Sequence, residues 1–283
     1  MLVTGFPAGS FAANCYLVAP ARGEECIIID PGQDAERGID DLLREYRLKP
    51  VAVLLTHGHS DHVWSVAPVC GAKGVPAYIH TSDRALLSDP ARGFPLGPAQ
   101  QLFGGLTLSE PDDVRELTDG LTLRIAGLEI TTDHAPGHTP GSVVFRLPGE
   151  APGPRTAARQ GGGGRDTAGN SEGNSEGNSE GGEEAGLMFS GDLLFAGSIG
   201  RTDLPGGDYQ TIMDSLRRVC LPLPADTVVL PGHGPDTTIG AERASNPFLA
   251  PLVRTAGEGQ RHGADSAAGA ADRPGGNAGA RGL

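Results

Sequence analysis

The stretch THGHSDH at residues 56–62 places three histidines and one aspartate within seven residues, although the whole chain of 283 residues has only eight histidines. His57 and His59 stand two residues apart, so that on extended backbone both rings can point to the same side. Asp61 and His62 follow directly. Imidazole nitrogen and carboxylate oxygen are ligands of zinc, and also of iron and manganese. The pattern therefore predicts a metal site.

Four ligand-type residues exceed the three protein ligands that usually hold one catalytic zinc ion, which indicates two metal ions. Further candidates lie beside predicted strands, namely His138 in HAPGHTPGS, Asp192 in SGDLLF and His233 in LPGHG. Sites of α/β sheets gather at such strand ends. Taken one by one, the 57–62 stretch can also be an exposed polar turn, the two later histidines can be structural, and the aspartate can cap a helix.

These residues resemble the metallo-β-lactamase superfamily, whose motif HxHxDH stands here at residues 57–62. All seven ligand positions of the superfamily are matched in order by His57, His59, Asp61, His62, His138, Asp192 and His233. The resemblance implies an α/β fold, a four-layered αββα sandwich. It also implies that the first metal ion is bound by His57, His59 and His138, the second by Asp61, His62 and His233, and both by Asp192.

Two further segments are similar to the glyoxalase II branch, GHTPGS at 137–142 and GRTDLPGGD at 200–208. That branch hydrolyses thioesters of glutathione with hydroxy acids. The similarity implies two Zn²⁺ ions per chain, with iron or manganese as alternatives, and a small-molecule thioester attacked by a metal-bridged hydroxide that Asp61 orients. The C-terminal helical domain typical of glyoxalase II has no counterpart after His233, so the chain resembles the short bacterial hydroxyacylglutathione hydrolases, and the thiol carrier stays open.

An oxidoreductase is the alternative. Persulfide dioxygenases share this fold and a GRTD loop, and they use one iron ion held by two histidines and one aspartate. Such an enzyme would leave Asp61, His62 and His233 without a metal ion. The number and kind of bound metal ions therefore distinguish the two hypotheses.

The elements that must position these residues are predicted to alternate between strands and helices. NCYLVA and ECIIID look like strands, residues 34–47 have a helical period, and VAVLLT, directly before the 57–62 stretch, suits a strand buried on both faces. Strand patterns continue in VPAYIH, LTLRI, LEITT, SVVFRL, LMFS and TVVL, and helices are predicted after residue 63, at 82–88 and after Asp208. This alternation favours a layered α/β domain.

Composition divides the chain into one expected domain at residues 1–255 and a tail. A Gly/Ser/Glu-rich insertion at about 148–186 contains three GNSE repeats, and its low hydrophobicity predicts disorder. We expect it in a hairpin loop, because the cost of loop closure grows slowly with length. Residues 89–113, rich in Pro and Gly, are expected to be irregular, and residues 256–283 to be a disordered tail.

The charge balance argues against nucleic acid as a partner, since 22 Lys and Arg stand against 35 Asp and Glu, without a basic cluster. No apolar run approaches the roughly 20 residues of a membrane span, and the N-terminus lacks the basic start of a signal peptide. We therefore predict a cytoplasmic protein without membrane contact. The four cysteines form no CxxC motif and are expected to be reduced core residues.

Several polar residues have two interpretations. Asp30 is either a hydrogen-bond acceptor behind a ligand histidine or a turn residue at a strand end. His134, four residues before His138, is expected to support the site or the fold rather than to bind metal. Arg201 either pairs with Asp203 or meets a substrate carboxylate.

Three aromatic residues lie near the motifs in sequence. Trp64 follows the histidine stretch and is expected to pack under the site and to shape its pocket. Phe195 and Tyr209 either line the substrate cleft or belong to the core. No role in the site is expected for His80 or His262.

Overall fold

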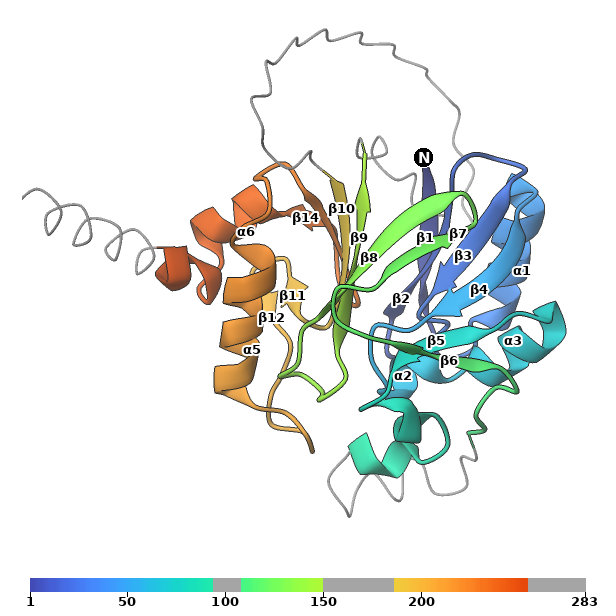
Figure 1. Cartoon of the computed structure of the whole chain (residues 1–283), viewed down its shortest axis with the longest axis horizontal. Helices are drawn as coiled ribbons and strands as arrows, with labels where there is room; N and C mark the ends of the chain where they lie inside the picture. The colour runs from blue at the N-terminus through green and yellow to red at the C-terminus, as the bar shows by residue number, and fades with distance from the viewer. Residues whose placement is uncertain (94–107, 150–185, 254–283) are drawn as a thin grey trace, which may run out of the picture.

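The computed structural model describes residues 1–93, 108–149 and 186–253, and these form two sheets with helices outside them (Figure 1). The first sheet has the strand order β1-β2-β3-β4-β5-β6. Its strands are β1 (Leu2–Ala8), β2 (Ala13–Ala19), β3 (Glu25–Ile29), β4 (Lys49–Leu54), β5 (Ala77–His80) and β6 (Val114–Leu117). Strands β1 to β3 pair antiparallel and β3 to β6 pair parallel.

The second sheet has the order β14-β13-β10-β9-β8-β7. Its strands are β7 (Thr122–Ile125), β8 (Leu128–His134), β9 (Val143–Pro148), β10 (Gly186–Gly191), β13 (Val228–Pro231) and β14 (Thr237–Thr238). Only β10 and β13 pair parallel. A small hairpin of β11 (Leu194–Phe195) and β12 (Ser198–Ile199) follows β10.

Helices cover the outer face of each sheet. On the first sheet lie α1 (Glu36–Tyr46), α2 (Ser60–Val63) and α3 (Val66–Lys73), followed after β5 by the short 3-10 helices η1 (Arg84–Leu87) and η2 (Pro90–Gly93). On the second sheet lie α5 (Tyr209–Ser215), its π-helical continuation η3 (Leu216–Cys220) and α6 (Ile239–Ser245).

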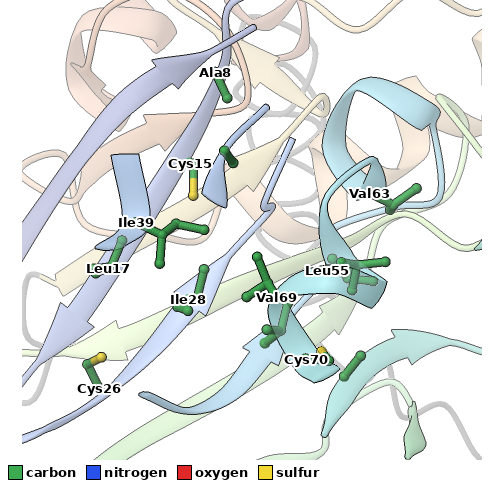
Figure 2. Close-up of a cluster of buried hydrophobic side chains, with 14 of the residues drawn as sticks. Ala8, Cys15, Leu17, Cys26, Ile28, Ile39, Leu55, Val63, Val69 and Cys70 are labelled. Carbon is green, nitrogen blue, oxygen red and sulfur yellow. The ribbon is translucent and has the colours of Figure 1, made fainter. Parts of the chain in front are cut away.

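Three buried clusters hold these layers together and confirm the four-layered αββα sandwich. The first packs α1 and α3 on the first sheet and contains Ile39 of α1, Val69 of α3 and Ile28 of β3 (Figure 2). The second lies between the sheets and contains Phe145 and Phe189. The third packs α5, η3 and α6 on the second sheet. Each interface removes apolar surface from water, which is the main favourable term in folding.

The apolar runs that predicted strands follow from burial on both faces. In β3, Ile28 belongs to the cluster under the helices, whereas Ile27 and Ile29 belong to the cluster between the sheets. Successive strand side chains point to opposite faces, so a strand between two apolar layers needs a hydrophobic residue at every position. Val53 and Leu54 of β4 divide between the same two clusters.

Most predicted elements are present, with some differences. The helix predicted at 82–88 is the 3-10 helix η1. The seven-residue elements β1 and α6 were not predicted, and neither were β6, β11, β12 and β14, because strands of two to four residues show little periodicity. The four cysteines are buried free thiols. None of the helices in the described ranges is both long and apolar enough to cross a membrane.

The predicted insertion and tail lie outside the described residues, as does most of the 89–113 segment. The strands on either side of the insertion pair antiparallel, with Gly186 opposite Pro148. The two ends of the intervening segment therefore lie next to each other, which is the arrangement that a hairpin-loop insertion requires. The division into one domain and a tail stays a prediction.

Candidate metal centre

All seven predicted ligand residues lie at strand ends of the two sheets. The 57–62 stretch connects β4 to α2, and His138 lies in the loop between β8 and β9. Asp192 and His233 directly follow β10 and β13, which are parallel neighbours, so that their ends meet at the same edge. Residues far apart in the sequence therefore converge on one place.

The convergence produces three overlapping groups in which the potential ligand atoms lie within 4.8 Å of one another. These groups are His57, His59 and His138; His57, His62 and Asp192; and Asp61, His62 and His233. The first and third are the two triplets that the superfamily resemblance implies. We call them the first and the second ligand group.

In the first ligand group, hydrogen bonds fix the tautomer of His57. The Thr56 hydroxyl donates to Asp30 Oδ2 at 2.6 Å, so it is left to accept from His57 Nδ1 at 3.1 Å. Nε2 of His57 then carries a lone pair. That atom is buried and has no hydrogen-bond partner among the described residues. A buried nitrogen without a partner is unfavourable unless a ligand such as a metal ion satisfies it.

His138 is fixed in the same way. Its Nδ1 donates to the carbonyl oxygen of Arg201 at 2.8 Å, which leaves a lone pair on Nε2. This Nε2 lies 2.9 Å from His59 Nδ1. The three imidazoles of the first ligand group are buried, and their nitrogens converge as tetrahedral zinc coordination by histidine requires.

In the second ligand group, Asp30 orients His62. Nδ1 of His62 donates to Asp30 Oδ2 at 3.0 Å, and Nε2 faces His233 Nε2 at 3.2 Å. Asp61 Oδ2 lies 3.2 Å from the same nitrogen of His233. A carboxylate behind a ligand histidine is a recurrent device of metal sites. Of the two interpretations of Asp30, the hydrogen-bond acceptor is therefore the one that the geometry supports.

Asp192 lies between the two groups. Its Oδ2 is 3.5 Å from His138 Nε2 of the first group, and its Oδ1 is 3.4 Å from His62 Nε2 of the second. Oδ1 is buried without a hydrogen-bond partner among the described residues. The two oxygens of one carboxylate thus face both groups, which is the geometry that a bridging ligand needs.

Burial and neighbouring charges separate the pKa values of the two groups. Burial, together with the other histidines, holds the pKa of His57 well below its usual range, and burial with His138 lowers that of His59 to about 3. For His62, burial alone would lower the pKa, but Asp61, Asp192 and Asp30 raise it to about 10.

The other two members of the second group follow from the same contacts. Burial opposes ionisation of Asp61, but the charge of His62 and the hydrogen bond from His233 hold its pKa well below the usual range. The pKa of His233 is raised despite its burial, because Asp61 and Asp192 lie beside it. Before metal binding, His57 and His59 are therefore neutral at pH 7, whereas His62 and Asp61 of the second group are charged.

Two glycines allow this close approach of backbone and side chains. A Cβ atom at Gly232 would lie 2.2 Å from Asp192 Oδ1 and 2.8 Å from His62 Cε1. A Cβ atom at Gly58 would lie 2.7 Å from Leu86 Cδ1. Both positions need glycine because space is lacking: a side chain at Gly232 would displace Asp192 or His62, and one at Gly58 would collide with Leu86.

Comparison with known proteins agrees with this geometry. The family model described as the metallo-beta-lactamase superfamily matches residues 8–150 and 177–233. The chain belongs to the metallo-beta-lactamase superfamily. Its buried histidines and aspartates and its fold are those of a metal-dependent hydrolase of this superfamily.

Two relatives bear on the type of hydrolase. An uncharacterized protein of Mycobacterium tuberculosis is 44% identical over 90% of this chain and 100% of its own length. The hydroxyacylglutathione hydrolase GloC of Haemophilus influenzae is 33% identical over 86% of this chain and 95% of its own length. The chain thus covers nearly the whole of both proteins.

Two solved structures of the superfamily are also similar. The BLEG-1 B3 metallo-beta-lactamase has a TM-score of 0.67 and 38% identity, and the match covers 88% of this chain and 99% of that one. TTHA1623 in a di-iron-bound form has a TM-score of 0.60 and 36% identity, and the match covers 85% and 97%.

The remaining predicted residues lie outside the three groups. His134 donates to the carbonyl oxygen of Pro140 and stacks on His80, with ring centroids 4.1 Å apart. Arg201 forms two hydrogen bonds of 2.8 Å with Asp203, both side chains being largely exposed. The pairing interpretation of Arg201 is thus the one seen in the structure.

The three aromatic residues differ in their surroundings. Trp64 packs against the core cluster under the helices of the first sheet. The ring of Phe195 lies 6.2 Å from that of His233 and is therefore next to the second ligand group. Tyr209 is 53% exposed and does not belong to the core.

Two residues that contact the ligand segments were missed by sequence reasoning. Thr56 links His57 to Asp30, and Asp83 accepts hydrogen bonds from residues next to the ligands. Thr56 directly precedes the histidine stretch, so its position was a usable signal. Asp83 follows an unremarkable strand, and nothing in its sequence context points to the site.

Proposed function

We propose that the chain is a binuclear metal-dependent hydrolase that cleaves thioesters such as hydroxyacylglutathiones. The observation that carries the proposal is the presence of two complete ligand groups that Asp192 faces from between them. The similarity to GloC supports the substrate class. The metal ions would be Zn²⁺, with iron as the alternative that the di-iron form of TTHA1623 supports; manganese suits the same ligands.

The residues present fit a pair of divalent cations. The first would be held by His57, His59 and His138, and the second by Asp61, His62 and His233, with Asp192 shared. When bound, such cations supply a water molecule that is deprotonated near neutral pH and a Lewis acid for a carbonyl oxygen. The negative charge of Asp61 and Asp192 partly balances the positive charge of the two cations.

Among the described residues near the site, the Cys15 thiol is not an activated nucleophile. Burial raises the pKa of the Cys15 thiol well above its usual value, and Asp30 adds to this effect. A protonated, buried thiol is a poor nucleophile. Cations held by the two ligand groups would supply a water nucleophile instead, and a thiolate would be a good leaving group for its attack.

Three residues would orient the ligand histidines and the attacking water. Asp30 and Arg201, through its carbonyl oxygen, hold Nδ1 of His62 and His138, so that both Nε2 atoms face the centre. Asp61 would accept a hydrogen bond from the attacking water with whichever oxygen does not bind metal. Fixing the nucleophile relative to the carbonyl lowers the entropic part of the barrier.

The test is hydrolysis of S-lactoylglutathione and of thioesters of other thiols by protein of measured metal content. We expect turnover by protein with two metal ions per chain and at least 100-fold slower turnover by Asp61→Asn. A cephalosporin is assayed in parallel because of the similarity to the BLEG-1 metallo-beta-lactamase. Cleavage of the cephalosporin without any thioester turnover would refute the substrate class and leave the metal centre intact.

The persulfide dioxygenase alternative is tested with the same samples. It predicts one iron ion per chain and consumption of oxygen with a glutathione persulfide. Asp61, His62 and His233 form a complete ligand group, and that enzyme class would leave this group without a metal ion. This observation favours the hydrolase.

A further inference from the structure

Asp83 is a buried carboxylate that contacts both segments of the first ligand group without being one of its ligands. Its side chain is fully buried. Oδ2 accepts hydrogen bonds from the backbone N–H of Gly58 at 2.9 Å and from the Thr139 hydroxyl at 2.6 Å. Oδ1 accepts from the backbone N–H of Gly141 at 2.7 Å.

The location of Asp83 shows that these contacts are not incidental to helix capping. Asp83 occupies the N-cap position of η1, where an aspartate usually accepts a hydrogen bond from its own helix. Its side chain makes no such bond. The carboxylate is directed instead toward the loops that carry the ligand histidines.

The environment of Asp83 is unusual for a buried charge. Within the described part of the chain, no lysine or arginine forms an ion pair with it, and its hydrogen-bond donors are two amides and one hydroxyl. A buried carboxylate without a cation is costly unless hydrogen bonds and nearby positive charge compensate. Cations bound by the first ligand group would supply that charge.

The three hydrogen-bond donors of Asp83 lie in loops that are connected to different sheets. Gly58 lies between His57 and His59 after β4 of the first sheet, and Thr139 follows His138 before β9 of the second. One carboxylate therefore ties together the two segments on which the first group depends. The fit is tight, because a Cβ atom at Gly141 would lie 2.5 Å from Asp83 Cγ.

We propose that Asp83 is a positioning residue for the first metal ion. Asp83 sets the separation between His138 on one side and His57 and His59 on the other. The proposal rests on the proposed two-metal centre but not on the choice of substrate. Residues that orient metal ligands typically change metal affinity by 10- to 100-fold when they are replaced.

Asp83→Asn is the direct test. Both carboxylate oxygens accept from a backbone N–H, so the new amide must point its NH₂ group at one of these donors in either orientation. We expect this conflict to move the Gly58 segment away from the Thr139 segment. The affinity for the first metal ion should then fall by roughly 10- to 100-fold.

The two ligand groups are separated by measuring the variant in two backgrounds. His233→Ala disrupts the second group and leaves the first, and His138→Ala does the reverse. Zinc affinity is measured by competition with a chromophoric chelator, and the visible spectrum of bound Co²⁺ reports the coordination geometry. Asp83→Asn should weaken binding and change the Co²⁺ spectrum in the His233→Ala background, and should change binding less than threefold in the His138→Ala background.

Glu242→Gln is the matched control. Glu242 is also a buried carboxylate whose hydrogen-bond donors are neutral, namely Gly197 N, Thr237 Oγ1 and Asn246 Nδ2. None of these donors belongs to the 57–62 or 138–142 segments. We expect Glu242→Gln to lower the melting temperature of the metal-free protein without weakening zinc binding in the His233→Ala background.

Thr139 provides milder variants that are expected to fold if Asp83→Asn does not. Thr139→Val removes one of the three hydrogen bonds of Asp83, whereas Thr139→Ser keeps the hydroxyl. Thr139→Val should lower the affinity for the first metal ion, whereas Thr139→Ser should keep most of that affinity.

The inference is overturned if Asp83→Asn or Thr139→Val lowers only the melting temperature while zinc affinity and the Co²⁺ spectrum stay those of the parent. It is also overturned if Asp83→Asn lowers the zinc affinity equally in the His233→Ala and His138→Ala backgrounds. Failure of the proposed function looks different, because the protein with unaltered Asp83 would then bind fewer than two metal ions or cleave no thioester.

Discussion

Asp30 Oδ2 accepts a hydrogen bond of 3.0 Å from His62 Nδ1, although the two residues are 32 positions apart in the chain. Both side chains are almost completely buried. In the neutral ring this bond places the hydrogen on Nδ1, so that Nε2, which faces His233 and Asp192, is the nitrogen available to a metal ion once the ring has lost its second proton. Asp30 thus decides whether His62 can act as a ligand.

Asp30→Asn should therefore weaken binding of the second metal ion more than binding of the first, because Asp30 contacts His62 directly but reaches His57 only through the Thr56 hydroxyl. The amide can present its oxygen either to the Thr56 N–H or to His62 Nδ1, but both oxygens of Asp30 are now acceptors. If the NH₂ group faces His62, the proton of the imidazole moves to Nε2 and metal binding is blocked. We expect a 10- to 100-fold loss of affinity at the second site, measured by chelator competition.

The control for that variant is Asp41→Asn, at an exposed carboxylate that pairs with Arg44 on the surface of α1. It should leave both affinities unchanged. Equal loss at both sites in Asp30→Asn would contradict the assignment of Asp30 to His62.

The number of bound metal ions should follow the two ligand groups. Elemental analysis should give about two ions per chain for the unaltered protein and about one for His138→Ala or His233→Ala, because each variant removes a ligand from only one group. Removal of all metal by a chelator should abolish turnover, and added Zn²⁺ should restore it. Two tightly bound ions in both variants would contradict the grouping.

The second metal ion should bind more tightly as pH rises, whereas His57 and His59 should add little pH dependence to the first. The pKa of His62 is raised to about 10, so in the metal-free protein His62 is protonated at neutral pH and must lose a proton on binding, and the raised pKa of His233 acts in the same direction. Each released proton changes the affinity about tenfold per pH unit below the folded pKa.

His57 and His59 have pKa values lowered by burial, that of His59 to about 3, so both are already neutral between pH 6 and 8. Affinities of the His138→Ala and His233→Ala proteins at pH 6, 7 and 8 check this expectation. A steeper pH dependence for the first group than for the second would contradict it.

The cluster between the two sheets should dominate stability. Phe145 is fully buried there, and its replacement by Ala should lower the free energy of unfolding by about 3–5 kcal/mol, because transfer and cavity terms add. Chemical denaturation of the metal-free protein measures the change. Tyr209→Ala, at a side chain that is 53% exposed, should stay within about 0.5 kcal/mol of the parent.

The sequence by itself determined the ligand types, their order and the layered fold. Spacing on extended backbone was enough to pair His57 with His59, and unbroken apolar runs such as VAVLLT were enough to predict strands with two buried faces, because both signals are local. Composition alone was enough to predict the insertion, since a segment with little to bury cannot offset its ordering entropy. Its disorder stays a prediction, because the segment lies outside the described residues.

Only the tertiary structure decided which distant residues share a contact. The roles of Asp30 and Asp83 depend on hydrogen bonds to segments 25 to 58 positions away. The opposite pKa shifts of His59 and His62, three residues apart, depend on burial and His138 for His59, and on Asp61, Asp192 and Asp30 for His62. Burial and hydrogen bonding are properties of the folded surroundings, so no local pattern of residue types encodes them.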